Sequence, residues 1–287
     1  MARPPERQAV ALDLYDTDSV SGGRRLDVLR AGVNRMAGAT RITDAIDAGK
    51  LARLWRIVLL ILVFVAGAWA WASGLLPQMW ELWDDIIYLL RQHVRLVLIS
   101  GGLAIAVGVP LGIWLSRPWM RGWAEALIQV LNVGTTIPTL AILALSMSLL
   151  GIGAVPAIFG LFVATLLPIV RNAYAGCQAV PGHLIEAAHG MGMTPGQILR
   201  RVELPNALFV IFAGIRTALA INVGTVPLAF LIGGGGLGEL IFQGIALNDF
   251  AMMLSGAIPT ALLAVLVDFL LAQAQYWLIP RGVNPLR

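Results

Sequence analysis

The run IVLLILVFVAGAWAWASGLL at residues 57–76 decides the fold class, because it holds twenty residues without a single charge. A helix of that length rises about 30 Å, which matches the apolar core of a lipid bilayer. We therefore expect residues 57–76 to cross a membrane as one helix.

Further apolar runs follow this one along the chain. They lie at residues 96–115, 126–150, 155–170, 207–232 and 251–278. The sequence thus predicts an all-α integral membrane protein with about six transmembrane helices. Between the first two runs, residues 77–94 hold Trp80 and Trp83 among acidic residues, which favours a helix at the outer membrane interface.

Composition also argues against a soluble domain. Hydrophobic residues make up 58% of the chain and charged residues 13%. In a soluble domain, roughly a quarter of all residues are charged. The mean hydropathy is +0.81, and the pI is near 9.8. A basic chain can bind nucleic acid, but the placement of the arginines fits a membrane instead, so we expect no nucleic-acid partner.

The basic residues orient the predicted spans. Ten of the 20 precede residue 57, and a cytoplasmic location for that end places 17 of the 20 on the cytoplasmic side, as the positive-inside rule requires. Both termini are then cytoplasmic. The exceptions are Arg91, Arg95 and Arg216.

Two regions follow from this topology. Residues 1–50 form a cytoplasmic N-terminal tail whose start we expect to be disordered, and residues 51–287 form the transmembrane domain. Residues 26–56 mix arginines with apolar residues. That mixture fits either an amphipathic helix on the inner leaflet or a solvated flank.

The cytoplasmic loop at residues 177–205 is the most informative segment, and its core reads VPGHLIEAAHGMGMTPGQILRRVELP over residues 180–205. Pro181 suits the first position of a helix, and Gly192 suits the left-handed residue that ends one. Thr194 and Gln197 form a capping box for a second helix, which we expect Pro205 to close. The sequence predicts two short helices, either as a docking element or as a plain connector.

This loop resembles the EAA motif of permeases of ABC importers. The family pattern is Glu-Ala-Ala, three residues, Gly, nine residues, and then Ile-x-Leu-Pro. The chain matches it at every element except Val202, which replaces Ile. The matching residues are Glu186, Ala187, Ala188, Gly192, Leu204 and Pro205.

The resemblance implies the fold of a type I importer permease, in which this loop is a coupling helix that docks on an ATPase subunit. It also implies an extracytoplasmic solute-binding protein, a second permease copy, identical or not, and the bacterial inner membrane. ATP would be bound by the partner subunit, so this chain would have no cofactor and would be a transport subunit, not an enzyme.

Other segments resemble the osmoprotectant permeases, which import glycine betaine, choline or carnitine. They are LPIVRNAYAG at 167–176, GMGMT at 190–194, AGIRTA at 213–218 and IGGGGLG at 232–238. The resemblance covers roughly residues 90–280 and leaves the tail without a role. Another small solute, such as methionine, stays open as the cargo.

The sequence itself carries no ATP-binding loop. Such a loop needs Gly-Lys-Ser/Thr, and the one lysine, Lys50, is followed by Leu51. The glycine string at 233–238 lies outside by topology and follows a span, so we interpret it as a flexible outer turn, not as a dinucleotide site. The three histidines show no metal-ligand spacing, and no catalytic set can be assigned.

Several polar residues fall within the predicted spans, where they are often functional. Arg216 and Asp268 could pair, or each could face a water-filled path. Asn-Val-Gly-Thr occurs twice, before Pro138 and before Pro227, and polar breaks at corresponding positions can mark a transport path. The candidates for the path are Asn132, Thr135, Asn222 and Thr225.

Two other classes of protein remain as alternatives to the importer permease. A secondary transporter driven by an ion gradient would need no ATPase subunit. A membrane-embedded enzyme would need a metal or nucleophile constellation, which the sequence does not offer.

Overall fold

The computed structural model describes residues 55–65, 67–68, 70–280 and 282–283. The described residues form helices and turns, with no strand among them. The chain divides into two units, Met1–Trp69 and Ala70–Arg287. The predicted tail over residues 1–50, with its disorder, lies outside the described residues, as does nearly all of the amphipathic segment.

The first apolar run is helical where it is described. The helix Trp55–Ala72 has the length and composition of a membrane span. Its side chains over residues 55–65 are exposed, as expected of a segment whose environment is lipid.

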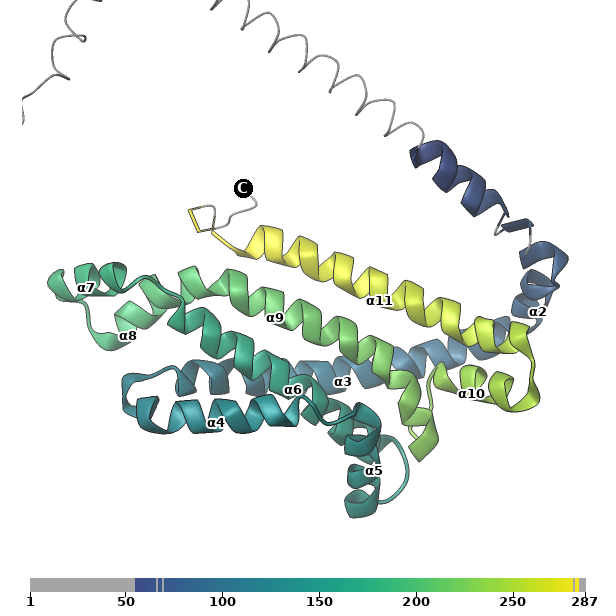
Figure 1. Ribbon diagram of the computed structural model, residues 1–287, viewed down its shortest axis with the longest axis horizontal. Helices are drawn as coiled ribbons and strands as arrows, with labels where there is room; N and C mark the ends of the chain where they lie inside the picture. The colour runs from purple at the N-terminus through teal and green to yellow at the C-terminus, as the bar shows by residue number, and fades with distance from the viewer. Residues whose placement is uncertain (1–54, 66, 69, 281, 284–287) are drawn as a thin grey trace, which may run out of the picture. The chain divides into compact units, whose positions relative to one another are not determined.

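The second unit is built almost entirely of helices (Figure 1). In chain order they are α2 (Leu75–Glu81), α3 (Trp83–Leu115), η1 (Pro118–Met120), α4 (Arg121–Gly134), α5 (Thr139–Leu150), α6 (Ala154–Gln178), α7 (Gly182–Gly190), α8 (Pro195–Ile198), η2 (Leu199–Glu203), α9 (Leu204–Thr225), η3 (Val226–Ile232), α10 (Gly238–Leu247) and α11 (Phe250–Leu278).

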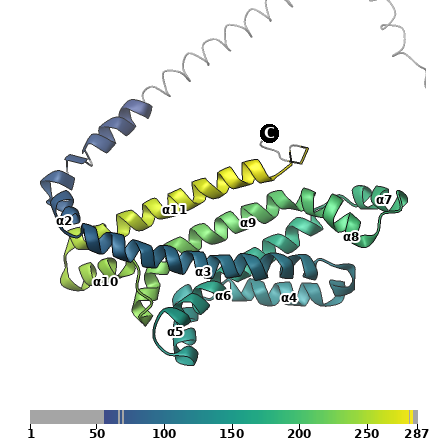
Figure 2. The same ribbon diagram turned by 180° about the vertical axis from the view of Figure 1, so that it is seen from behind.

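Four long helices, α3, α6, α9 and α11, supply the frame of this unit. Helix α6 packs against both α3 and α9, and α11 packs against α9 (Figures 1 and 2). Buried Ala104, Ala173 and Ala218 lie in one core cluster between α3, α6 and α9. Such small side chains let membrane helices approach closely.

The expected spans match the helices, with two differences. Helix α3 is continuous from Trp83, so the separate interface helix predicted over residues 77–94 is limited to the short α2. The third predicted span is broken, because α4 and α5 meet at 96°. Pro138, in extended conformation at the start of α5, lies at this break. Because proline interrupts helical hydrogen bonding, it explains why the helix does not continue through this position.

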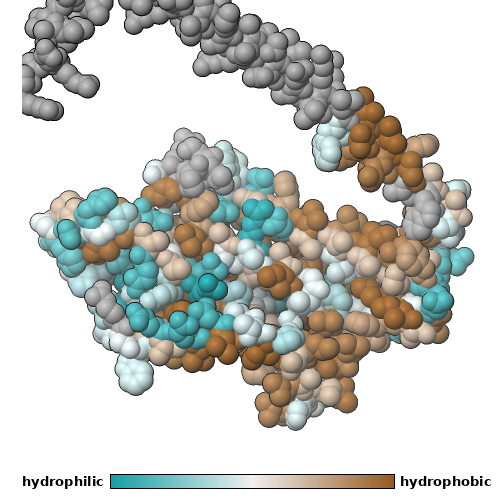
Figure 3. All heavy atoms as spheres, viewed as in Figure 1, coloured by the Kyte–Doolittle hydropathy of each residue, from teal (hydrophilic) through white to brown (hydrophobic). Residues whose placement is uncertain are grey.

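The described residues therefore contain five helices able to span a membrane, or six if the bent pair counts as one span. Figure 3 shows hydrophobic residues gathered over α5, and many hydrophilic residues at the end that carries α7 and α8. This division agrees with an integral membrane protein that presents one polar end to water.

The glycine turn between η3 and α10 is closely packed, contrary to a free outer turn. The N–H of Gly236 donates to Gln92 Oε1 at 3.0 Å, and the N–H of Gly153 donates to the Ile232 carbonyl at 2.9 Å. Gly235 and Gly236 have φ of +76° and +90°, a region that other residues rarely adopt. The glycines thus allow a tight turn against α3.

At the same end of the unit, Asp249 joins α11 to α2. Its carboxylate accepts from the N–H of Met252 at 3.0 Å, which caps α11, and from Gln78 Nε2 at 2.8 Å. These two bonds, the Met252 bond foremost, hold the pKa of the Asp249 carboxyl below its usual range. The ionised form of Asp249 is therefore the one that holds the start of α11 against α2.

Close approach of α3 to α6 gives a stability prediction. A Cβ added at Gly112 would lie 2.5 Å from Ala173 Cβ and 2.6 Å from the Val170 carbonyl oxygen. We expect Gly112→Ala to cost about 1–3 kcal/mol of stability, as overpacking does. Thermal unfolding in detergent measures this loss. Gly102→Ala, on the same helix with nothing within 4 Å, is the control, and equal behaviour of the two variants would refute the close contact.

Candidate functional site

Helices α7 and α8 form the predicted pair of short helices at one end of the long helices (Figure 1). We call residues 182–198 the knob. Gly192 has φ of +74°, and the N–H of Met193 donates to the Ala188 carbonyl at 3.1 Å. The left-handed residue that ends the first helix is therefore confirmed.

The start of the second helix is also confirmed. Gln197 Oε1 accepts from the backbone N–H of Thr194 at 2.8 Å, as in a capping box, and Pro195 is the first helical residue. Pro181 lies one position earlier than predicted, because α7 begins at Gly182.

The predicted role of Pro205 as the end of the second helix is wrong. The chain stays helical from α8 through η2 into α9, and Pro205 lies in the first turn of α9. Proline is tolerated here because η2 is a π-helical turn, in which the N–H of Leu204 donates to the Leu199 carbonyl. That wider turn removes the clash that proline makes in a regular helix. The knob is thus continuous with a spanning helix.

The residues of the Glu-Ala-Ala motif divide between surface and interior. Glu186, Ala187 and Gly192 are exposed, whereas Ala188 is fully buried. Leu204 and Pro205 are half-buried at the base of the knob. The exposed members can contact another protein, and the others hold the knob in shape.

An ion pair that sequence reasoning missed lies at the base of the knob. Arg117, beyond the end of α3, donates to Glu203 in η2, and the side chains are 12% and 13% exposed. The two residues are 86 positions apart. Glu203 occupies the unspecified position of the motif, so nothing in one sequence marks it.

Arg216 and Asp268 form a bidentate ion pair between α9 and α11, so the pairing alternative is the one observed. Arg216 Nε bonds Asp268 Oδ1, and Nη2 bonds Oδ2 at 2.6 Å. Each side chain remains 39% exposed. This chain alone therefore does not enclose the pair.

The four path candidates do not form one cluster. Asn222 is buried and donates to Thr165 Oγ1 at 2.6 Å and to Ser100 Oγ at 3.2 Å, so it links three helices. Thr225 donates to the Asn222 carbonyl at 3.0 Å. Thr135 is exposed in the turn that follows α4, and its hydroxyl donates to the carbonyl of half-buried Asn132 at 2.7 Å. No hydrogen bond among the described residues joins the two pairs.

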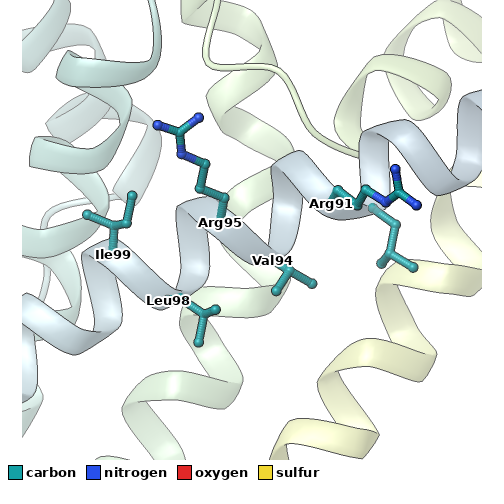
Figure 4. A pocket seen from close by; sticks show the side chains of 6 residues that line it. Arg91, Val94, Arg95, Leu98 and Ile99 are labelled. Carbon is teal, nitrogen blue, oxygen red and sulfur yellow. The ribbon is translucent and has the colours of Figure 1, made fainter.

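A shallow, mostly apolar hollow of about 500 Å³ lies on the N-terminal half of α3. Figure 4 shows Arg91 and Arg95 on one flank of the helix and Val94 and Leu98 on the other. Neither arginine forms an ion pair with another described residue. No group of three potential metal ligands occurs in the described part of the chain.

The ion pair within the spans gives a testable stability pattern. Asp268→Asn leaves a lone guanidinium among membrane helices, so we expect a lower unfolding midpoint in detergent. The double variant Asp268→Asn/Arg216→Gln removes both charges and should recover most of that loss. If the loss of stability in the double variant equals the sum of the losses in Asp268→Asn and in Arg216→Gln alone, the pairing is contradicted.

The fold resembles solved importer permeases. One match is a structure titled as inward-facing conformations of the MetNI methionine ABC transporter, with TM-score 0.59, 25% identity, and coverage of 72% of this chain and 98% of that one. A second is an amino acid ABC transporter, with TM-score 0.58 and 19% identity over 69% and 96% of the two chains.

Sequence relatives agree with the fold. The chain is 54% identical over 216 residues to the osmoprotectant import permease protein OsmY of Salmonella typhimurium, covering 75% of this chain and 89% of that one. It is 43% identical over 203 residues to the choline transport system permease protein OpuBB of Bacillus subtilis, covering 71% and 93%. The profile of the family described as binding-protein-dependent transport system inner membrane component matches residues 108–282. The chain therefore belongs to this family, whose members are multi-pass permease subunits of ABC importers.

Proposed function

We propose that this chain is the transmembrane subunit through which an ATP-driven importer moves an osmoprotectant, such as glycine betaine or choline, across the bacterial inner membrane. The observation that carries the proposal is the knob. It presents Glu186 and Ala187 to the surface and is continuous with a spanning helix. ATP is hydrolysed by a separate subunit on which the knob docks.

The chemistry of the knob suits docking. Ala187 and Gly192 are small and exposed, so a partner surface can approach the backbone closely. Glu186 adds a carboxylate that can pair with a basic group of the partner. Both termini and the knob are cytoplasmic in this proposal, as the distribution of basic residues favours.

A second permease copy completes the pathway in this proposal. The Arg216–Asp268 pair lies within two spanning helices and is 39% exposed on each side chain. Charged groups within spans face other protein or water rather than lipid. A second permease subunit, or the water-filled path between two subunits, faces the charged pair. The apolar side chains on the rest of the spanning helices contact lipid.

The proposed path includes Asn132, Thr135, Asn222 and Thr225. Thr135 is exposed, and Asn132 Oδ1 has no hydrogen-bond partner among the described residues. Exposed Thr135 can therefore meet a partner or solute, whereas Asn132 Oδ1 is buried and becomes available to one only if the packing around it opens. Asn222 would act more indirectly, because its bonds to Thr165 and Ser100 fix α9 against α3 and α6.

The relatives support the choice of solute. Relatives at 54% and 43% identity are named for osmoprotectants and for choline, whereas the methionine transporter is 25% identical. Selection among solutes then rests mainly on an extracytoplasmic solute-binding protein. Methionine remains the second candidate because of the shared fold.

Coupling is tested by Gly192→Trp. This change places a bulky side chain at the docking surface and on a residue with φ of +74°, where non-glycine residues are strained. We expect solute uptake per ATP hydrolysed to fall at least about tenfold, with membrane insertion unchanged.

Proteoliposomes containing the whole complex measure this ratio. Gly122→Trp, which is exposed on α4 with nothing within 4 Å, is the matched control. Normal coupling in Gly192→Trp would show that the knob does not drive transport.

The solute is tested in the same proteoliposomes with the cognate binding protein. We expect ATP-dependent uptake of labelled glycine betaine or choline and none of methionine. Uptake of methionine alone would select the second candidate. Uptake driven by an ion gradient, with no co-purifying ATPase, would reject the importer assignment altogether.

A further inference from the structure

The junction between the knob and the turn after α3 is only partly filled. A cavity of about 540 Å³ lies there. Residues that line it come from three parts of the chain: Ser116, Trp119, Cys177, His189, Ile198 and Leu199. Direct packing therefore leaves a gap between the knob and the end of α3.

One polar contact crosses this gap. The guanidinium of Arg117 pairs with the carboxylate of Glu203, and both side chains are nearly buried. No other hydrogen bond or ion pair joins residues 113–120 to residues 182–205 where side chains are described. A displacement of the knob can thus reach α3 by this route.

Arg117 is fixed firmly to the end of α3. Its Nε donates to the Ile113 carbonyl at 3.1 Å, and its Nη2 donates to Ser116 Oγ at 2.9 Å. Ser116 in turn donates to the same carbonyl at 2.7 Å. The guanidinium is therefore part of the helix end rather than a free side chain.

Glu203 is placed by its backbone at the base of the knob. It is the last residue of the π-helical turn η2, and α9 begins at the next residue. π-Helical turns are rare and occur often at functional sites. The turn places the carboxylate where the knob joins α9, so movement of the knob moves this group.

We propose that the Arg117–Glu203 pair is a strut that transmits the displacement of the knob to α3 and, through the following turn, to α4. The inference rests on the proposed function, because it presumes that an ATPase subunit moves the knob. Arg117 and Glu203 are positioning residues for coupling and contact neither ATP nor solute. A buried ion pair suits this task because its geometry is specific and its separation leaves an unpaired charge.

Neutral variants test the strut. In Glu203→Gln and Arg117→Gln the complex with the ATPase should still assemble and hydrolyse ATP. Uptake per ATP in proteoliposomes should fall at least about fivefold in each. The double variant should be no worse than either single one, because both singles break the same contact. Glu125→Gln, at an exposed carboxylate on α4, should leave the ratio unchanged.

Reversal of the pair separates a strut from a merely structural contact. Arg117→Glu/Glu203→Arg restores opposite charges across the gap, so uptake per ATP should recover at least half of the loss. Wild-type coupling in both neutral variants would overturn the proposal. So would loss of assembly in every charge variant, because the pair would then hold the fold rather than transmit movement.

The two proposals fail in different ways. If no ATPase subunit co-purifies with the unaltered chain, the importer assignment itself is wrong. If the ATPase co-purifies and Gly192→Trp uncouples transport, but Glu203→Gln does not, only the strut is rejected.

Discussion

The unbroken helical run from Pro195 to Ile232 is the constraint on which the rest of the structure depends. It begins in the polar knob and continues through a π-helical turn into a helix long enough to cross a membrane. A helix transmits axial and lateral displacement because its backbone bonds are satisfied internally, which lipid also demands. In the proposed mechanism, a force on the knob would therefore move the spanning helix.

The packing around that helix explains how a movement of α9 can pass to α3 and α6. Alanine and glycine bring α3, α6 and α9 close together, and buried Asn222 ties them by hydrogen bonds to Thr165 and Ser100. At the other end, Asp249 and the glycine turn fix α11, α2 and α3. The helices are thus joined firmly within the membrane, while the junction beside the knob holds a cavity bridged by one ion pair.

The sequence predicted the spans and the local form of the knob because both depend on short-range rules. Apolar run length places the spans, and Gly192 and the Thr194 cap act within a few residues. The sequence predicted the wrong role for Pro205, as the end of the second short helix, because proline usually ends a helix. The π-helical turn that accommodates Pro205 has no simple sequence signature. Pro138 marks the break locally, but the 96° angle between α4 and α5 and the Arg117–Glu203 contact depend on tertiary packing, which one sequence does not encode by spacing.

Site-specific photo-crosslinking in the intact membrane tests the central claim, that the knob is held by a separate ATP-hydrolysing subunit. A photoreactive residue at exposed Ala187 should capture that subunit. The same group at Ile152, which is 79% exposed in the turn between α5 and α6, should capture none of it. Capture from Ile152 and not from Ala187, or capture from neither position, would contradict the account.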